Sequence, residues 1–191
     1  MIAFKIYHRR SGHCVLKESP LRMIPPRKIA FWGKKKEKEN SRFRAFLKSH
    51  ADPDELDQRF KSLHEEIFAA YDCSKCRNCC KEYNASVPDN EIASDAEFLA
   101  MPADEFKTRY FSGQNQNGDW ISRGLPCCFL NGNECILQDH KPESCKLFPY
   151  TNQPDRMGSL MNTMEIAQVC PIAYEIIERL KQEYQWTPYG R

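Results

Sequence analysis

Apolar residues recur at helical spacing along residues 53–71 and define the clearest predicted helix of the chain. Asp52 is a suitable N-cap, Pro53 fits the first turn, and Glu55 stands three residues after the cap. The apolar positions that would share one face are Leu56, Phe60, Leu63, Ile67 and Tyr71. We therefore expect an amphipathic helix whose end leads directly into a cysteine-rich segment that begins at Cys73.

Prolines mark the starts of further predicted helices. Pro88 opens a helix over about residues 89–100, and Pro102 opens another over 103–111. The last helix starts at Pro171. Its predicted buried stripe consists of Ile172, Ile176, Ile177, Leu180 and Tyr184. The chain is therefore expected to be mostly helical.

Breakers and polar residues mark the segments outside these helices. Residues 1–40 contain prolines, glycines and a run of lysines, so we expect an irregular arm, followed by a short basic helix from Ser41. Residues 112–124 are polar and predict a loop. The segment 131–133, Asn-Gly-Asn, lies between two short apolar segments and suits a β-hairpin turn. The predicted fold is mostly α with a short β-hairpin.

Charge is distributed unevenly, although the 191-residue chain has a formal net charge of only +2. Residues 1–50 carry 14 Lys/Arg against 3 Asp/Glu, whereas residues 51–191 carry 14 against 23. We therefore divide the chain into a basic N-terminal arm over 1–50 and a cysteine-rich domain over 51–191. A basic arm is typical of contact with nucleic acid or a membrane surface. Aromatic residues are not regularly interleaved with its charges, so a solvated arm is the favoured interpretation.

Hydropathy predicts no membrane span, because no stretch of about 18 apolar residues is present. The first residues also lack the apolar run of a signal peptide. We therefore expect the reducing cytoplasm, where clustered cysteines are more often metal ligands than disulfides. Met23 is an alternative start that would remove residues 1–22, including Cys14.

The chain has 10 cysteines, and four of them lie in the segment Cys73-Ser-Lys-Cys76-Arg-Asn-Cys79-Cys80. A Cys-x-x-Cys spacing lets one tight turn aim two sulfurs at one metal, and thiolates suit zinc and iron–sulfur clusters. Neighbouring side chains diverge, so Cys79 and Cys80 favour two adjacent sites or one polynuclear site. A redox pair or inert buried thiols are the alternatives. A redox motif would open a helix in a βαβ unit, whereas this segment follows a helix.

The remaining cysteines extend this pattern, which resembles the CxxCxxCC cysteine-cluster family, the YkgJ-type domains described as zinc- or iron-chelating. That family continues with Cys-x-Phe-Leu, Cys-x-Ile-Tyr, Arg-Pro-x-x-Cys-Arg-x-Phe-Pro and a late Cys-Pro. The matching segments here are 127–130, 135–138, 141–149 and 170–171, so the resemblance spans about residues 70–175. The metal ligands that it implies are Cys73, Cys76, Cys79, Cys80, Cys127, Cys135, Cys145 and Cys170. It also implies a small domain organised by metal.

Three positions depart from the family pattern. Lys141 and Lys146 replace both arginines, and Gln138 stands where tyrosine is usual. Lysine is a point charge and does not reproduce the bidentate pairing of arginine with a carboxylate or another anion. Any such role is therefore expected to be weaker in this chain, whereas the eight thiols are intact.

The resemblance implies zinc or iron without deciding between them. A Cys-x-x-Cys-x-x-Cys run with a distal Cys-Pro, here at Cys170, is the pattern of bacterial ferredoxins, which favours an iron–sulfur cluster over zinc. His140 lies between two ligand candidates, but at a variable family position, and we expect it to be an exposed loop residue. His64 has no second histidine nearby and is expected on the surface, partly exposed.

Three functions are compatible with these features. The first is a cytoplasmic metal- or cluster-binding protein that stores, senses or delivers metal, or passes electrons. The second is an enzyme, because some proteins with this domain resemble flagellin lysine N-methylases, which need S-adenosylmethionine. Neither a GxGxxG segment nor a P-loop supports that function here. The third is a zinc-stabilised module whose basic arm contacts nucleic acid or another protein.

Overall fold

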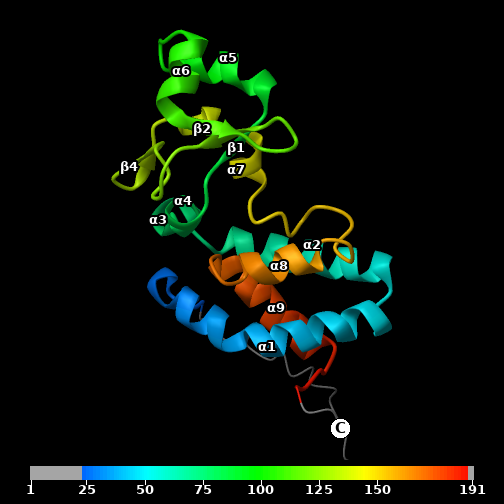
Figure 1. Ribbon diagram of the computed structural model, residues 1–191. Coiled ribbons are helices and arrows are strands. Elements are labelled where there is room, and N and C mark those ends of the chain that lie inside the picture. Colours follow the sequence, from blue (N-terminus) through cyan, green and yellow to red (C-terminus); the bar gives the residue numbers. More distant parts are fainter. Residues whose placement is uncertain (1–22, 189–191) are drawn as a thin grey trace, which may run out of the picture.

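The fold consists of two layers joined by the cysteine segment that begins at Cys73 and ends at Cys80 (Figure 1). The computed structural model describes residues 23–188. Four helices form what we call the helical layer: α1 (Pro26–His50), α2 (Pro53–Ala69), α8 (Leu160–Ile166) and α9 (Pro171–Glu183). Their apolar faces enclose one continuous hydrophobic core. The predicted mostly helical fold is confirmed.

Helix α2 forms as the sequence predicts. The Asp52 side chain accepts a 3.0 Å hydrogen bond from the backbone N–H of Glu55, which satisfies one of the free donors of the first turn. Leu56, Phe60 and Ile67 are fully buried against the helical layer, and α9 is the main partner of α2. The predicted helix over 53–71 is therefore confirmed, with its last turn ending at Ala69.

Residues 26–40, expected to be irregular, instead belong to the long helix α1. Pro26 stands in the first turn, where its missing N–H costs no hydrogen bond. Gly33 allows close packing, since a Cβ at this position would lie 2.5 Å from the Cα of Gln168. Ile29 and Phe43 are buried in the helical-layer core. Residues 1–22 of the predicted arm lie outside the described residues, and the domain division at residue 50 stays a prediction.

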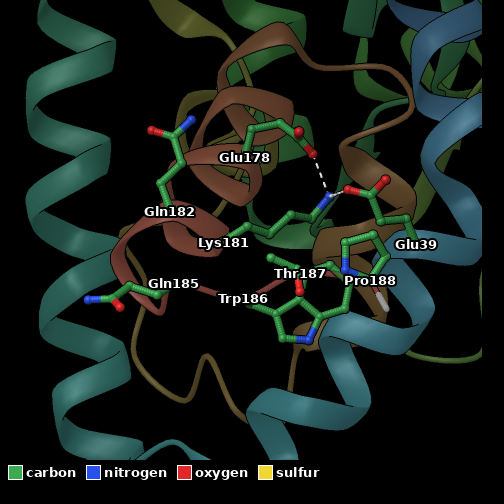
Figure 2. A pocket seen from close by; sticks show the side chains of 8 residues that line it. All are labelled: Glu39, Glu178, Lys181, Gln182, Gln185, Trp186, Thr187 and Pro188. Carbon is green, nitrogen blue, oxygen red and sulfur yellow. Dashed lines mark hydrogen bonds and ion pairs between the residues drawn. The ribbon is translucent and has the colours of Figure 1, made fainter. Parts of the chain in front are cut away.

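A buried ammonium group ties α1 to α9. Lys181 is 5% exposed, and its Nζ lies 2.8 Å from Glu39 Oε1 and 2.7 Å from Asn40 Oδ1. Glu178 supplies a third partner at 2.5 Å (Figure 2). A pocket of about 300 Å³ opens beside these groups, lined by Glu39, Glu178, Lys181, Gln182, Gln185, Trp186, Thr187 and Pro188. No cysteine lines it, so it lies apart from the thiol chemistry.

The second layer, which we call the mixed layer, contains α5 (Asp89–Phe98), α6 (Ala103–Tyr110) and a three-stranded antiparallel sheet. In this sheet β3 (Trp120–Ser122) lies between β1 (Ser86–Val87) and β2 (Phe111–Gln114). The two predicted helices over 89–100 and 103–111 are confirmed. The predicted loop over 112–124 is wrong in part, because β2 and β3 pair across its turn.

Aromatic side chains dominate the core of the mixed layer. Phe106, Phe111 and Phe129 are buried together, with ring centroids 5.3 to 5.9 Å apart. Cys127 belongs to this core as well. The layer thus holds a thiol among aromatic rings, away from solvent.

A short hairpin extends from the mixed layer, as predicted. Strand β4 (Leu130–Asn131) pairs with β5 (Glu134–Cys135), and Leu130 faces Cys135. Gly132 has a φ of 59°, the left-handed conformation that glycine adopts without strain. The hairpin fixes the position of Cys135, in β5, relative to Cys127, which lies just before β4.

Two short helical segments complete the mixed layer. The 3-10 helix η1 covers Gln138–His140, and α7 covers Glu143–Leu147. Helix α7 packs beside β1, where the Ser144 hydroxyl donates a 2.5 Å hydrogen bond to the Ser86 carbonyl. The described residues form no helix with the length and apolar character needed to cross a membrane.

Candidate metal centre

The four clustered cysteines, Cys73, Cys76, Cys79 and Cys80, lie on two short helices at the junction of the layers (Figure 1). Helix α3 covers Cys73–Cys76 and α4 covers Asn78–Glu82. The Asp72 carboxylate caps α3 by accepting a 3.0 Å hydrogen bond from the Ser74 N–H. Arg77, between the helices, has a φ of 51°. This left-handed residue turns the chain, so that α4 starts in a new direction.

Hydrogen bonds join this segment to both layers. Below it, the Asn78 side-chain amide donates to the Val169 carbonyl at 2.7 Å, immediately before Cys170. Above it, the backbone N–H of Cys127 donates to the Cys80 carbonyl at 2.7 Å. The two contacts bring distal cysteines from opposite layers to the same short helix.

The hairpin lies against the first Cys-x-x-Cys turn. Arg77 Nε donates to the Asn133 carbonyl at 3.0 Å, and the Asn133 side chain donates to the Ser74 carbonyl at 2.8 Å. Asn133 is one of the two residues between the paired strands. The turn that the sequence predicts thus also holds the cysteine segment in place.

The eight predicted ligands differ in burial. Cys127 and Cys170 are buried, with 8% and 7% of their surface exposed. Cys76, Cys79, Cys80 and Cys135 are half-buried. Cys73 and Cys145 are exposed as residues, yet burial of the sulfur raises the pKa of their thiols to about 11 and about 12.

Two thiols ionise near neutral pH because neighbours stabilise the thiolate. The Cys79 and Cys80 sulfurs lie 3.9 Å apart, and their hydrogen bond lowers the pKa of Cys80 to about 7. Cys128, together with the Phe129 backbone N–H, lowers the pKa of Cys127 to about 6 against the effect of burial. The Ser122 hydroxyl, 3.7 Å from the Cys127 sulfur, acts in the same direction.

Positive charge also faces the thiols. Lys141 lowers the pKa of Cys73, Cys80 and Cys135, although burial is the larger effect on Cys73 and Cys135 and acts in the opposite direction. Arg77 acts in the same way on Cys73 and Cys80. Lys141 occupies one of the two positions at which the sequence departs from a family arginine, and it still supplies the charge.

The family model described as "CxxCxxCC: Putative zinc- or iron-chelating domain" matches residues 72–171, which is more than half of the chain. The chain belongs to this family. All eight predicted ligands lie within the matched residues of the CxxCxxCC domain. Searches of curated proteins and of solved structures find no similar protein.

The donor set of this CxxCxxCC domain fits the metals in the family description. All nine cysteines of the described residues are free thiols. Thiolate sulfur is the ligand that zinc and iron–sulfur clusters share. Within residues 23–188, no three or more His, Cys, Asp and Glu side chains form a preassembled ion-binding group. Coordination by the thiols therefore requires them to move toward a common metal.

Other residues beside the thiols were not predicted as part of the CxxCxxCC site. Tyr71 was assigned only to the apolar face of its helix. Burial raises its pKa, with further contributions from a hydrogen bond to Cys76 and from the charge of Cys170. Its position two residues before Cys73 could have indicated from the sequence that it lies beside the thiols. Cys128 donates its thiol proton to the Tyr110 carbonyl at 3.2 Å.

The structure gives both histidines of interest partners other than cysteines. His64 is 8% exposed, with Nδ1 2.8 Å from Thr151 Oγ1 and its ring stacked on Phe68. The expectation of a partly exposed surface histidine is therefore wrong, because its ring packs under the loop that carries Thr151. His140 is exposed, as predicted, and stacks on Phe98 with ring centroids 4.2 Å apart.

Proposed function

We propose that the CxxCxxCC domain binds an iron–sulfur cluster, with zinc as the alternative, through the eight cysteines of the family pattern. These ligands are Cys73, Cys76, Cys79, Cys80, Cys127, Cys135, Cys145 and Cys170. The observation that carries the proposal is the contact between cysteine-bearing segments: the Asn78 side chain on α4 donates to the Val169 carbonyl beside Cys170, and the Cys127 N–H donates to the Cys80 carbonyl, each at 2.7 Å. The ligands come from α3, α4, β5, α7, the segment before β4 and the N-cap of α9.

The charge state of the thiols supports this function. Metal ligation requires thiolates, and the pKa values of about 7 for Cys80 and about 6 for Cys127 leave roughly half of the first and most of the second ionised at neutral pH. Cys145 and Cys170, whose pKa values burial raises to about 12, would release a proton when metal binds. Metal affinity should therefore fall as the pH falls.

The sequence pattern favours iron–sulfur over zinc. The Cys-x-x-Cys-x-x-Cys run from Cys73 to Cys79 also occurs in cluster-binding ferredoxins, and Cys170-Pro171 supplies a distant Cys-Pro. A cluster would supply electron transfer or redox sensing, whereas zinc would supply structural stability. Free thiols of this number suit a reducing compartment, and we propose the cytoplasm.

Anaerobic purification tests the proposal. The same sample would be analysed for iron, zinc, acid-labile sulfide and visible absorption. We expect a brown protein that contains iron and sulfide. A colourless protein with stoichiometric zinc would replace the cluster by zinc and direct attention to a structural role. A protein that contains no metal and takes up neither iron with sulfide nor zinc would overturn the proposed function.

A further inference from the structure

Helix α1 carries a row of positive charges on the side that faces away from the helical layer (Figure 1). Its inner side packs on α8 and α9 and buries Ile29, Phe43 and Leu47 in the core. Residues spaced by three, four, seven or eight positions share one face of a helix. The outer face carries five exposed cations at such spacings, which we call the basic stripe: Arg27, Lys34, Lys35, Lys38 and Arg42.

The two acidic residues of α1, Glu37 and Glu39, neutralise little of this stripe. Glu39 Oε1 lies 2.8 Å from the Nζ of buried Lys181 and 2.8 Å from Lys36 Nζ, so its charge is used on the inner side. Glu37 lies 2.6 Å from Lys34 Nζ. Within residues 23–188, Lys34 and Lys36 are the cations of α1 that form ion pairs. The other four charges of the stripe are therefore available to an anionic partner.

The packing of α1 fixes the spacing of these charges. Gly33 allows the helix to lie directly on the segment that follows α8, where a Cβ would meet the Cα of Gln168 at 2.5 Å. The buried Lys181 joins the same helix to α9 through Glu39 and Asn40. At 1.5 Å per residue, the stripe from Arg27 to Arg42 is about 22 Å long. A partner therefore meets an ordered row of cations and does not have to order a flexible chain.

A linear polyanion fits this surface better than a flat membrane. An amphipathic helix binds a bilayer by burying its apolar face in it, and the apolar face of α1 lies in the protein core. A flat surface would also contact elements beside α1, and residues 51–191 carry 23 Asp/Glu against 14 Lys/Arg. A nucleic acid can follow the stripe alone, and about 22 Å corresponds to six or seven base pairs at about 3.4 Å each.

The aromatic residues of α1 favour a duplex over a single strand. Proteins bind single strands by stacking successive bases on aromatic rings. Phe31 is the exposed aromatic residue of α1, at 65% exposure. Trp32 is half-buried, and Lys35 Nζ lies 4.7 Å from the centroid of its ring. One exposed ring cannot stack successive bases, so contact with phosphates is the interaction that the stripe offers.

We propose that the basic stripe of α1 binds the phosphate backbone of a nucleic-acid duplex. Contacts to phosphates position a protein without reading the bases, so binding should not depend on base sequence. The interpretation of residues 26–40 as a solvated arm required an irregular chain, and the helix removes that premise. The inference is independent of metal binding, because α1 contains no cysteine.

Matched variants of the full chain test the proposal. Lys38→Gln removes one charge from the stripe, and Lys61→Gln removes one from an exposed position of α2 as the control. A triple variant combines Lys35→Gln, Lys38→Gln and Arg42→Gln, all at exposed residues. Fluorescence anisotropy would measure binding to DNA and RNA duplexes of about 20 base pairs, each from about 50 to about 200 mM salt. Vesicles containing phosphatidylserine serve as the alternative anionic probe, and circular dichroism verifies folding.

We expect the wild type to bind one or both duplexes, with a slope of log K against log salt of about −4 or steeper. Lys38→Gln should make the slope shallower by about 1 and the triple variant by about 3, whereas Lys61→Gln should leave it unchanged. Every sample retains residues 1–22, so differences between variants report on α1. Equal effects of Lys38→Gln and Lys61→Gln would overturn the proposal, as would a wild type that binds neither duplex at low salt. Binding to vesicles alone would assign the stripe to a membrane surface instead.

Discussion

The side-chain amide of Asn78 donates a 2.7 Å hydrogen bond to the carbonyl of Val169, the residue before Cys170. This contact connects α4, which carries Cys79 and Cys80, to the start of α9. The donor and acceptor are separated by 91 positions in the sequence. The orientation of Cys170 toward the first cysteine segment therefore depends on a side chain that is not itself a ligand candidate.

Replacing Asn78 by alanine should weaken metal binding by the thiols that Cys170 joins. Residues that orient metal ligands typically contribute about 10- to 100-fold in affinity, and we expect a loss near the lower limit because the ligand itself stays. The measurement is the rate and midpoint of metal release to a competing chelator. Asn115→Ala is the matched control, since the Asn115 side chain donates at 3.2 Å to Asp119 within the turn between β2 and β3, which carries no ligand candidate. Equal effects of the two variants on metal release would contradict this role of Asn78.

Lys141 should control the reactivity of Cys80 in the metal-free protein. Its positive charge lowers the pKa of this thiol, so Lys141→Ala should raise the pKa and reduce the thiolate fraction at pH 7. A partly exposed charge pair contributes about 0.5–1 kcal/mol, which for a thiol that is half ionised at pH 7 corresponds to alkylation about two- to threefold slower. The rate at Cys80 would be followed by peptide mass spectrometry.

Two variants control for this effect. Lys141→Arg keeps the charge and should restore the rate, and Lys146→Ala removes an exposed lysine that does not act on Cys80. If Lys146→Ala slowed alkylation as much as Lys141→Ala, the net charge of the protein would explain the result. The specific effect of Lys141 on Cys80 would then be rejected.

The buried Cys170 thiol should make the metal-free protein sensitive to alkali. Burial raises its pKa from 9.0 to about 12, so the folded state binds this proton more tightly than the unfolded state. The stability that it contributes is fully present below about pH 9 and is lost as pH rises from 9 toward 12. One proton corresponds to at most about 1.4 kcal/mol per pH unit.

Chemical unfolding of the wild type and of Cys170→Ala, both reduced and treated with chelator, measures this contribution. The pH would be varied from 8 to 11, which spans the ordinary thiol pKa of 9.0 and stays below the raised value of about 12. The variant is expected to lose less stability per pH unit above about pH 9. Other groups titrate in both proteins, so the difference between the two curves is the relevant quantity. Parallel curves would show that Cys170 ionises in the folded protein as readily as in the unfolded chain.

Local signals predicted the elements that depend least on distant contacts. Asp52 and the apolar face that begins at Leu56 define α2, and Pro171 with its apolar stripe defines α9. The hairpin turn at Gly132 was predicted from three residues. In each case residues within or next to the element cap its end or adopt the backbone conformation that its turn needs.

Elements that depend on tertiary partners were missed. Strands β1 and β3 each contain only two or three residues and exist through pairing with one another. Helix α1 contains Gly33 and a lysine run, and its N-terminal half is fixed by packing on α8 and α9. His64 is buried by Thr151, 87 positions away. The sequence spacing identified the eight ligand candidates, but not that Cys127 and Cys170 belong to different cores.

Gly33→Ala tests whether α1 is docked as the structure describes. In an exposed helix this change would stabilise by about 1 kcal/mol. Here the new Cβ would lie 2.5 Å from the Cα of Gln168, and backbone cannot move aside as a flexible side chain can. Overpacking typically costs about 1–3 kcal/mol, and an approach of 2.5 Å to backbone places this substitution near the upper limit, so we expect net destabilisation of about 2 kcal/mol by chemical unfolding. Lys34→Ala, at the neighbouring exposed residue, should change stability by less than about 0.5 kcal/mol. A Gly33→Ala protein as stable as the wild type would mean that α1 does not pack against residue 168, and that residues 26–40 behave as the free arm that their composition predicts.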